Sequence, residues 1–155
     1  MDCYSCKSIS GEQRISPGPP IMEGQYWVVE HAYPVKMVGW LVLVLKRHAE
    51  ALHELTTEEF AEMASMQEMV CRLLHKQTGC RKEYTVCFAE APHFHHVHVH
   101  VIARAHEMPD EIKGTGIFTM LKATEAEAVP REQIDNFCRK LRESLRVEAN
   151  DIDRR

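Results

Sequence analysis

The alternation of polar and apolar residues between positions 96 and 102 is the clearest structural pattern in the chain. A period of two is typical of a β-strand, whose successive side chains point to opposite faces. The pattern predicts a strand over 95–104 with His96, His98 and His100 on one face and valines on the other. Alternate Cα atoms of a strand lie roughly 6.6 Å apart, so neighbouring imidazoles can act on one substrate group or hold a metal. We expect one face of this strand to be core and the other to carry chemistry.

Further apolar segments predict three more strands. Residues 25–30 and 82–89 have strand character, and residues 39–46 are so uniformly apolar that we expect a central strand covered on both faces. A short turn at Pro92 separates segment 82–89 from the histidine strand, so these two strands should pair as an antiparallel hairpin.

Two helices are predicted from capping signals and from a helical period. The segment 56–59 reads Thr-Thr-Glu-Glu, a capping box that opens a helix, and Gly79 follows its end. A second amphipathic helix is predicted over 130–148, and the charged ending 151–155 is expected to fray. The expected buried residues are Phe60, Met63, Val70 and Leu74 in the first helix, and Ile134, Phe137, Cys138, Leu141 and Leu145 in the second.

The order of these elements predicts an α+β fold. We expect about five mostly antiparallel strands in one sheet, a central helix packed against it and an added C-terminal helix. The length of 155 residues fits one domain, which we place at 1–150.

Composition excludes two classes of partner. A net charge of −4 and a pI near 6.2 argue against the broad basic surface of a protein that binds duplex nucleic acid. The longest apolar stretch, residues 40–45, is too short to span a bilayer, and the N-terminus lacks the pattern of a signal peptide. We expect a soluble, cytoplasmic protein without a membrane partner.

The six cysteines fall into two groups. Cys3 and Cys6 form a C-x-x-C pair, a spacing shared by redox pairs and by half of a zinc site. Zinc needs two further ligands, which histidines can supply, although spacing does not select which of the ten histidines do so. The other four are expected to be reduced, packed thiols: Cys71, Cys80, Cys87 and Cys138.

The motif H-φ-H-φ-H-φ-φ, where φ is apolar, resembles the signature of the histidine-triad family of nucleotide hydrolases and transferases. The resemblance runs from Cys3 to about Lys113 and includes Arg104 after the motif. In its zinc-containing branch, a C-x-x-C pair near the N-terminus is joined by a loop histidine, which here is His48 in Lys-Arg-His.

The resemblance implies one structural zinc ion. The ligands would be Cys3 and Cys6, from an N-terminal knuckle and loop over residues 1–20, together with His48 and His96. Four protein ligands close the shell of the ion and leave no position for substrate.

The resemblance also implies a mechanism. His98, the middle histidine, would attack the α-phosphorus of a nucleoside phosphate ester, anhydride or phosphoramidate, and water would resolve the nucleotidyl-histidine. His100 would donate a hydrogen bond to a non-bridging phosphate oxygen. Such proteins commonly form homodimers, and we expect one here.

The chain departs from the family pattern at two places. Pro92 and His93 stand where relatives often carry polar phosphate-binding residues, so His93 either contacts phosphate or caps the turn. The acidic residue that grips ribose should fall near 31–32, where the nearest carboxylate is Glu30.

These departures keep two alternatives open. One is a nucleotide-binding regulatory module with weak or no catalysis, and the other is metal sequestration by the histidine-rich face. Four histidines are expected at the surface or half-buried, outside the site: His31, His53, His75 and His106.

Overall fold

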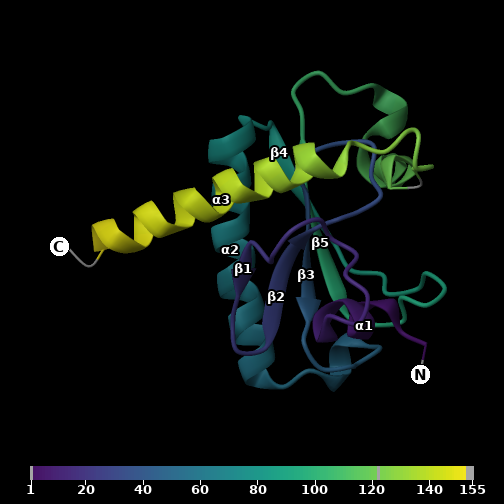
Figure 1. Ribbon diagram of the computed structural model, residues 1–155, viewed down its shortest axis with the longest axis vertical. Coiled ribbons are helices and arrows are strands. Elements are labelled where there is room, and N and C mark those ends of the chain that lie inside the picture. The colour runs from purple at the N-terminus through teal and green to yellow at the C-terminus, as the bar shows by residue number, and fades with distance from the viewer. Residues whose placement is uncertain (1, 122, 153–155) are drawn as a thin grey trace.

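The computed structural model describes residues 2–121 and 123–152 (Figure 1). The two predicted helices and the four predicted strands are present in the expected order, and the structure adds the short helix α1, the two-residue strand β1 and three 3-10 turns. The elements are α1 (Tyr4–Ser10), β1 (Met22–Glu23), β2 (Trp27–His31), β3 (Trp40–Leu45), η1 (Leu52–Glu54), α2 (Thr57–Thr78), β4 (Lys82–Val86), β5 (His98–Arg104), η2 (Asp110–Ile112), η3 (Gly114–Met120) and α3 (Arg131–Ile152).

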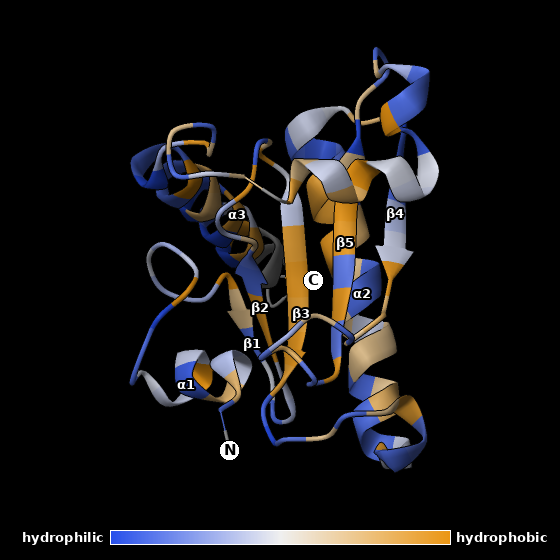
Figure 2. Ribbon diagram, turned by 90° about the vertical axis from the view of Figure 1, so that its right-hand side faces the viewer, coloured by the Kyte–Doolittle hydropathy of each residue, from blue (hydrophilic) through white to orange (hydrophobic). Residues whose placement is uncertain are grey.

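The five strands form one antiparallel sheet in the order β1-β2-β3-β5-β4. The prediction of a central, apolar strand is confirmed, because β3 lies in the middle and five of its six residues are buried. Figure 2 shows β3 in hydrophobic colours along most of its length, while hydrophilic bands interrupt β5 beside it. The α+β prediction is confirmed as well.

The predicted hairpin exists, but its strands are shorter than expected. β4 and β5 pair antiparallel, yet residues 87–97 form a long connection in place of a short turn at Pro92. Ala89 and His93 adopt positive φ values of 55° and 67°, which a strand does not allow. The residue before His98 hydrogen-bonds the segment after β3, since the Val97 N–H donates to the Ala49 carbonyl at 2.7 Å. His96 therefore lies outside the strand.

Helix α2 covers one face of the sheet. The Trp27 indole N–H of β2 donates to the Glu59 carbonyl at 2.8 Å, which fixes the first turn of α2 against that face. The capping box at Thr56 and the left-handed Gly79 after the helix confirm the predicted ends. The prediction that Phe60 lies on the buried side of this helix is wrong, because Phe60 is 39% exposed while the neighbouring Glu59 is buried. The Glu59 carboxylate closes the capping box and accepts two hydrogen bonds from Arg47.

The C-terminal helix α3 begins directly after Pro130, as predicted, and packs against α2 and β2. Ile134, Cys138 and Leu141 are buried. The second half of the helix projects beyond the body of the molecule (Figure 1). It continues to Ile152, past the predicted end at 148, so the first two residues of the expected tail are helical. Residues 153–155 lie outside the described part of the chain.

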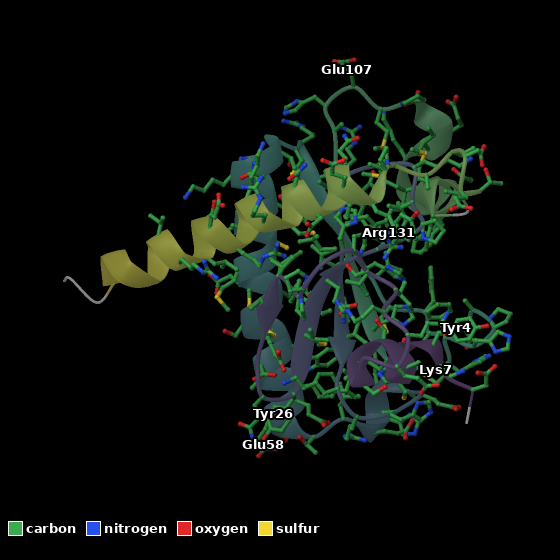
Figure 3. All side chains as sticks on the ribbon, in the orientation of Figure 1. Tyr4, Lys7, Tyr26, Glu58, Glu107 and Arg131 are labelled. Carbon is green, nitrogen blue, oxygen red and sulfur yellow. The ribbon has the colours of Figure 1, made fainter. Side chains whose placement is uncertain are left out.

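The segment between β5 and α3 folds over the end of the sheet through two 3-10 turns, η2 and η3. Glu107 in this segment lies at the opposite end of the molecule from Tyr26 and Glu58 (Figure 3). Across residues 2–121 and 123–152, no helix combines the length and the apolar character needed to cross a membrane.

His31 was expected near the surface, but its side chain is only 1% exposed. Its Nε2 accepts hydrogen bonds from the backbone N–H groups of Gly39 at 3.0 Å and Trp40 at 3.4 Å. Its Nδ1–H donates to the Ala32 carbonyl at 2.8 Å. The neutral ring thus ties β2 to the start of β3, and burial lowers the pKa of His31 to about 4.

Acid should weaken the fold through His31. In the unfolded chain this histidine binds a proton below about pH 6.5, whereas the folded chain resists protonation down to about pH 4. Stability therefore falls as the pH falls through that window. Urea unfolding at pH 7 and pH 4.5 should show that wild type loses about 2 to 3 kcal/mol more than His31→Gln, whose amide does not titrate. Equal losses in the two proteins would refute this role.

Candidate active site and metal centre

His98 and His100 project from the face of the sheet that α2 does not cover. In the strand register His98 lies opposite Val44 and His100 opposite Val42, so these four side chains share one face. The two imidazole rings meet edge to face, with centroids 4.8 Å apart. His98 is half-buried and His100 is buried. The structure thus brings the two predicted catalytic histidines together.

The hydrogen bonds of His98 define its tautomer. Its Nδ1 lies 2.6 Å from the backbone carbonyl of His96, which can only accept, so Nδ1 carries the proton. The Nε2 atom therefore holds a lone pair. Burial lowers the pKa of His98, which keeps the ring neutral and nucleophilic near pH 7.

His100 has the opposite tautomer. The Trp40 indole N–H, which can only donate, lies 3.0 Å from Nδ1 of His100. The proton of the neutral ring must then be on Nε2, where it can be donated to a ligand. Burial lowers the pKa of His100 to about 3, so the ring remains neutral throughout the physiological range.

An aromatic wall stands beside this pair. Phe118 of η3 packs edge to face on both Trp40 and His100, with centroid distances of 5.3 Å. Phe88 lies 5.3 Å from Phe118 and is 54% exposed, so an aromatic surface continues outward from His100. Trp40 and Phe118 were not among the predicted site residues. Trp40 carried a signal, since it shares a strand face with Val42, whereas Phe118 lies in an irregular segment without a periodic pattern.

The four predicted metal ligands form one cluster. Ligand atoms of Cys3, Cys6, His48 and His96 all lie within 4.8 Å of one another. The His96 Nδ1 is 3.5 Å from both cysteine sulfurs, and the His48 Nδ1 is 3.5 Å from Sγ of Cys6. A tetrahedral zinc ion with Zn–S near 2.3 Å and Zn–N near 2.0 Å separates its sulfur and nitrogen ligands by about 3.5 Å. The donor set and its spacing therefore fit zinc.

Outer hydrogen bonds orient both histidine ligands. The Nε2–H of His96 donates to the Leu45 carbonyl at 2.7 Å, and His48 Nε2 lies 3.4 Å from the Glu50 carboxylate. Each bond leaves Nδ1 unprotonated and facing the cysteines, as metal-binding histidines require. Burial lowers the pKa of His96, which also favours the neutral ligand.

The prediction that the imidazoles of His96, His98 and His100 share one strand face is wrong for His96. Its side chain is fully buried in the metal cluster, because the chain before His98 has left the strand. Its backbone carbonyl, however, accepts the Nδ1–H of His98. One residue thus joins the metal centre to the candidate nucleophile.

His93 has its contacts in the N-terminal segment. Its ring stacks on Tyr4 at a centroid distance of 4.8 Å, and its Nδ1 lies 3.0 Å from the Asp2 carboxylate. The Tyr4 N–H donates to the His93 carbonyl at 2.9 Å. These contacts hold α1 against the 87–97 loop, and a phosphate contact of His93 stays a prediction.

Glu30 lies in the row of the sheet that contains Val42 and His100. Its carboxylate is buried and forms a close ion pair with Arg14, which also donates to the Gly18 carbonyl at 3.1 Å. The carboxylate nearest the expected ribose position is therefore already neutralised by an arginine.

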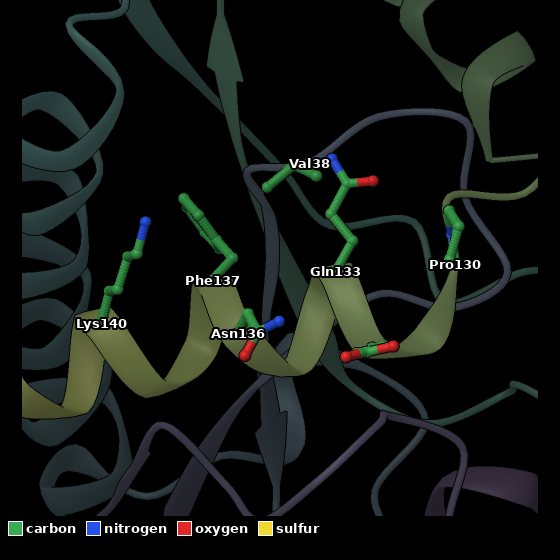
Figure 4. A pocket seen from close by; sticks show the side chains of 7 residues that line it. Val38, Pro130, Gln133, Asn136, Phe137 and Lys140 are labelled. Atoms are coloured by element: carbon green, nitrogen blue, oxygen red, sulfur yellow. The ribbon is translucent and has the colours of Figure 1, made fainter.

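A separate cavity of about 430 Å³ lies along α3 (Figure 4). Val38 lies between the side chains of Gln133 and Phe137 in this view. None of the seven residues that line it is a histidine or cysteine, so it has none of the groups that the site above would use.

A comparison with protein-family models finds the family that the histidine motif resembles. A family model described as "Scavenger mRNA decapping enzyme C-term binding", a domain of the histidine-triad type, matches residues 3–115. The chain belongs to the histidine-triad family. The match includes the cysteine pair, both candidate catalytic histidines and β1 to β5 of this histidine-triad domain. No curated protein matches the chain.

Solved structures of other histidine-triad proteins share the fold. A zinc-bound family member from Mycobacterium smegmatis is 18% identical, with 94% of this chain and 96% of that chain covered and a TM-score of 0.64. A hypothetical histidine triad nucleotide-binding protein from Sulfolobus tokodaii is 19% identical, with coverage of 92% and 93% and a TM-score of 0.66. A histidine triad protein from Sinorhizobium meliloti is 25% identical, with coverage of 82% and 89% and a TM-score of 0.61.

Proposed function

We propose that this histidine-triad protein is an enzyme that hydrolyses or transfers nucleotidyl groups at the α-phosphate of a nucleoside phosphate ester, anhydride or phosphoramidate. The observation that carries the proposal is the pair of complementary tautomers. His98 has a free lone pair on Nε2, His100 has an N–H donor on Nε2, and the centroids of the two rings lie 4.8 Å apart. A nucleophile and a donor for a phosphate oxygen are the two groups that such a displacement needs.

In the proposed reaction the Nε2 of His98 forms a bond to the α-phosphorus while the bond to the leaving oxygen or nitrogen breaks. The imidazole then carries a positive charge and still holds its proton on Nδ1. The hydrogen bond from this Nδ1–H to the His96 carbonyl strengthens as the charge develops. His100 donates from Nε2 to a non-bridging phosphate oxygen. Water then attacks the same phosphorus while the bond between phosphorus and Nε2 breaks, and the electron pair of that bond returns His98 to its neutral form. The proton that the water loses goes to solvent, and solvent supplies the proton that the leaving oxygen or nitrogen takes up.

Cys3, Cys6, His48 and His96 would hold the zinc ion. A closed shell of four protein ligands gives the ion a structural role, in which it ties the N-terminal segment to residue 96. The zinc-bound relative from Mycobacterium smegmatis supports this assignment. The same four side chains also keep the His96 carbonyl in place beneath His98.

Steady-state turnover tests the proposal. Purified protein should hydrolyse a dinucleoside polyphosphate or a nucleoside phosphoramidate and release a nucleoside monophosphate. Saturable binding of nucleoside monophosphate with no turnover of either substrate would favour the alternative, a regulatory nucleotide-binding module. The ion pair between Arg14 and Glu30 is the observation that favours that alternative, because it removes the carboxylate nearest the expected ribose position.

Trp40→Phe should lower kcat while leaving the fold intact. Phenylalanine keeps the ring packing but removes the indole N–H that holds the proton of His100 on Nε2. We expect kcat to fall by about 10- to 100-fold, less than the loss for removing His100 itself. Trp27→Phe is the matched control, because the indole of Trp27 donates to a carbonyl in α2 and not to a histidine. The kcat values of the two variants are compared with that of wild type. Equal kcat values for Trp40→Phe and wild type would contradict the tautomer assignment.

We also propose a homodimer in a reducing, cytoplasmic compartment, with no duplex nucleic acid or membrane as partner. The projecting half of α3 supports the dimer, because Leu145 is half-buried and Val147 is 58% exposed there. All six cysteines are free, which supports the reducing compartment. Light scattering at micromolar concentration should give twice the chain mass of 17.9 kDa, and a mass near 17.9 kDa would exclude a stable dimer.

A further inference from the structure

A second group of metal-ligating side chains lies where α2 ends and β4 begins. It contains His75, Cys80 and Glu83, whose ligand atoms all lie within 4.8 Å of one another. These residues come from the last turn of α2, the following bend and the edge strand β4. The proposed hydrolysis does not use them, and they are separate in sequence from the zinc ligands of the knuckle.

We propose that His75, Cys80 and Glu83 form a second binding site for a divalent ion of the zinc class. A thiolate, an imidazole and a carboxylate together match the ligand preference of zinc. Three protein ligands would leave one position open for water or another small ligand. Binding would release the thiol proton of Cys80 to solvent.

The distances between the ligand atoms are close to those of a tetrahedral site. Cys80 Sγ lies 3.2 Å from Oε1 of Glu83, and the His75 Nδ1 lies 4.0 Å from each of these atoms. Zinc with bonds of about 2.0 to 2.3 Å would separate such ligands by about 3.4 to 3.6 Å. A movement of the His75 ring by roughly half an ångström would complete the geometry. That ring is free to move, because its side chain is 65% exposed.

The backbone holds Cys80 and Glu83 in place before any ion binds. Gly79 adopts the left-handed conformation that ends α2 and turns the chain back at once. The Cys80 N–H donates to the Thr78 hydroxyl at 3.2 Å, and the Arg81 N–H donates to the Arg104 carbonyl of β5 at 2.8 Å. These bonds fix the bend between helix and sheet, so little order must be created by binding.

His75 must exchange one hydrogen bond for the metal. Its Nδ1–H now donates to the Cys80 carbonyl at 3.0 Å. A change of tautomer, in which the ring gives up the Nδ1 proton and takes one from solvent on Nε2, leaves a lone pair on Nδ1, the nitrogen that lies 4.0 Å from the Cys80 sulfur and from the Glu83 carboxylate. The exchange gives up this one part-buried hydrogen bond, a loss that is small beside the free energy of zinc coordination.

The test uses cobalt(II) as an optical probe on the full chain, after the knuckle has been loaded with one equivalent of zinc and with cysteines kept reduced. Titration should give one further bound equivalent with a thiolate-to-cobalt charge-transfer band. Cys80→Ser should abolish that band, and Glu83→Gln should raise the cobalt Kd at least about tenfold. His106→Ala, which removes an exposed histidine outside the cluster, should bind cobalt as wild type does.

Two results would overturn the site. One is a zinc-loaded protein that shows no further charge-transfer band at millimolar cobalt. The other is a band that persists in Cys80→Ser and has the same cobalt Kd in Glu83→Gln. Because Glu83 is half-buried on the edge strand β4 and Glu83→Gln keeps the side-chain shape, this variant tests the site even if Cys80→Ser fails to fold. Neither result depends on nucleotide turnover.

Discussion

Replacing His98 with alanine is expected to abolish turnover while the protein stays folded. The side chain is half-buried on a sheet face that α2 does not cover, so its loss removes little of the core. Each of the two rings has one unprotonated nitrogen. Nδ1 of His100 accepts a hydrogen bond from Trp40, whereas Nε2 of His98 accepts none from the residues that the structure describes. Loss of a nucleophile costs at least about a thousandfold in kcat.

Two further variants, His100→Ala and His53→Ala, are needed to interpret the result for His98→Ala. His100→Ala should keep some activity, because the loss of one donor to a developing phosphate charge costs about 100- to 1,000-fold. His53→Ala, an exposed histidine in η1, should be as active as wild type. Circular dichroism should be alike in all of them, and nucleotide affinity should be alike in wild type, His98→Ala and His53→Ala. A His98→Ala protein with more than a few per cent of wild-type kcat would show that another group is the nucleophile.

Disruption of the metal centre should lower both stability and activity. Cys6→Ser removes one of the four ligands, so zinc content should fall from one equivalent at the knuckle to a small fraction. The N-terminal segment would then lose its attachment to His96, and we expect a decrease in Tm of about 10 °C. The His96 carbonyl would also hold His98 less firmly, with an expected loss of about 10- to 100-fold in kcat.

Cys87→Ser is the matched control for this experiment, because Cys87 is half-buried and belongs to neither metal cluster. Elemental analysis of protein purified without added metal, together with thermal unfolding, compares the two variants. Unchanged zinc content in Cys6→Ser, or a wild-type protein in which Cys3 and Cys6 are freely alkylated, would exclude the knuckle.

The regular part of the fold could be predicted because local chemistry determines it. The uniformly apolar residues of β3 require burial on both faces, and only the middle of the sheet provides it. The capping box before α2 marks a helix start through hydrogen bonds between side chains and the backbone. The proline before α3 marks one because its φ is fixed near the helical value and it has no N–H to satisfy. Two of the predicted metal ligands, His48 and His96, could be placed only by the family resemblance, since ten histidines offered many equivalent choices for two positions. The cysteine pair was visible in the sequence, but its spacing alone also fits a redox pair.

What sequence periodicity could not predict depends on contacts between distant segments. The histidine strand was expected to begin at 95, but Val97 pairs with Ala49, which turns His96 into the metal cluster. The polar side chain of His31 favours a position at the surface or half-buried. It is buried instead, because the backbone N–H groups of Gly39 and Trp40 donate hydrogen bonds to it in the core. Trp40 selects the tautomer of His100 across two neighbouring strands. The first two pairings have no signature in the local sequence, and for the third the sequence shows only that Trp40 shares a strand face with Val42.

Trapping the covalent intermediate tests the central claim most directly. Wild-type protein is mixed with a substrate radiolabelled at the α-phosphate, quenched with base within milliseconds and digested. The account predicts label that is stable to base, labile to acid and located on the peptide that contains His98, with none on His98→Ala. Label on any other residue, or single-turnover hydrolysis that leaves no trapped intermediate while His98→Ala turns over at the wild-type rate, would contradict it.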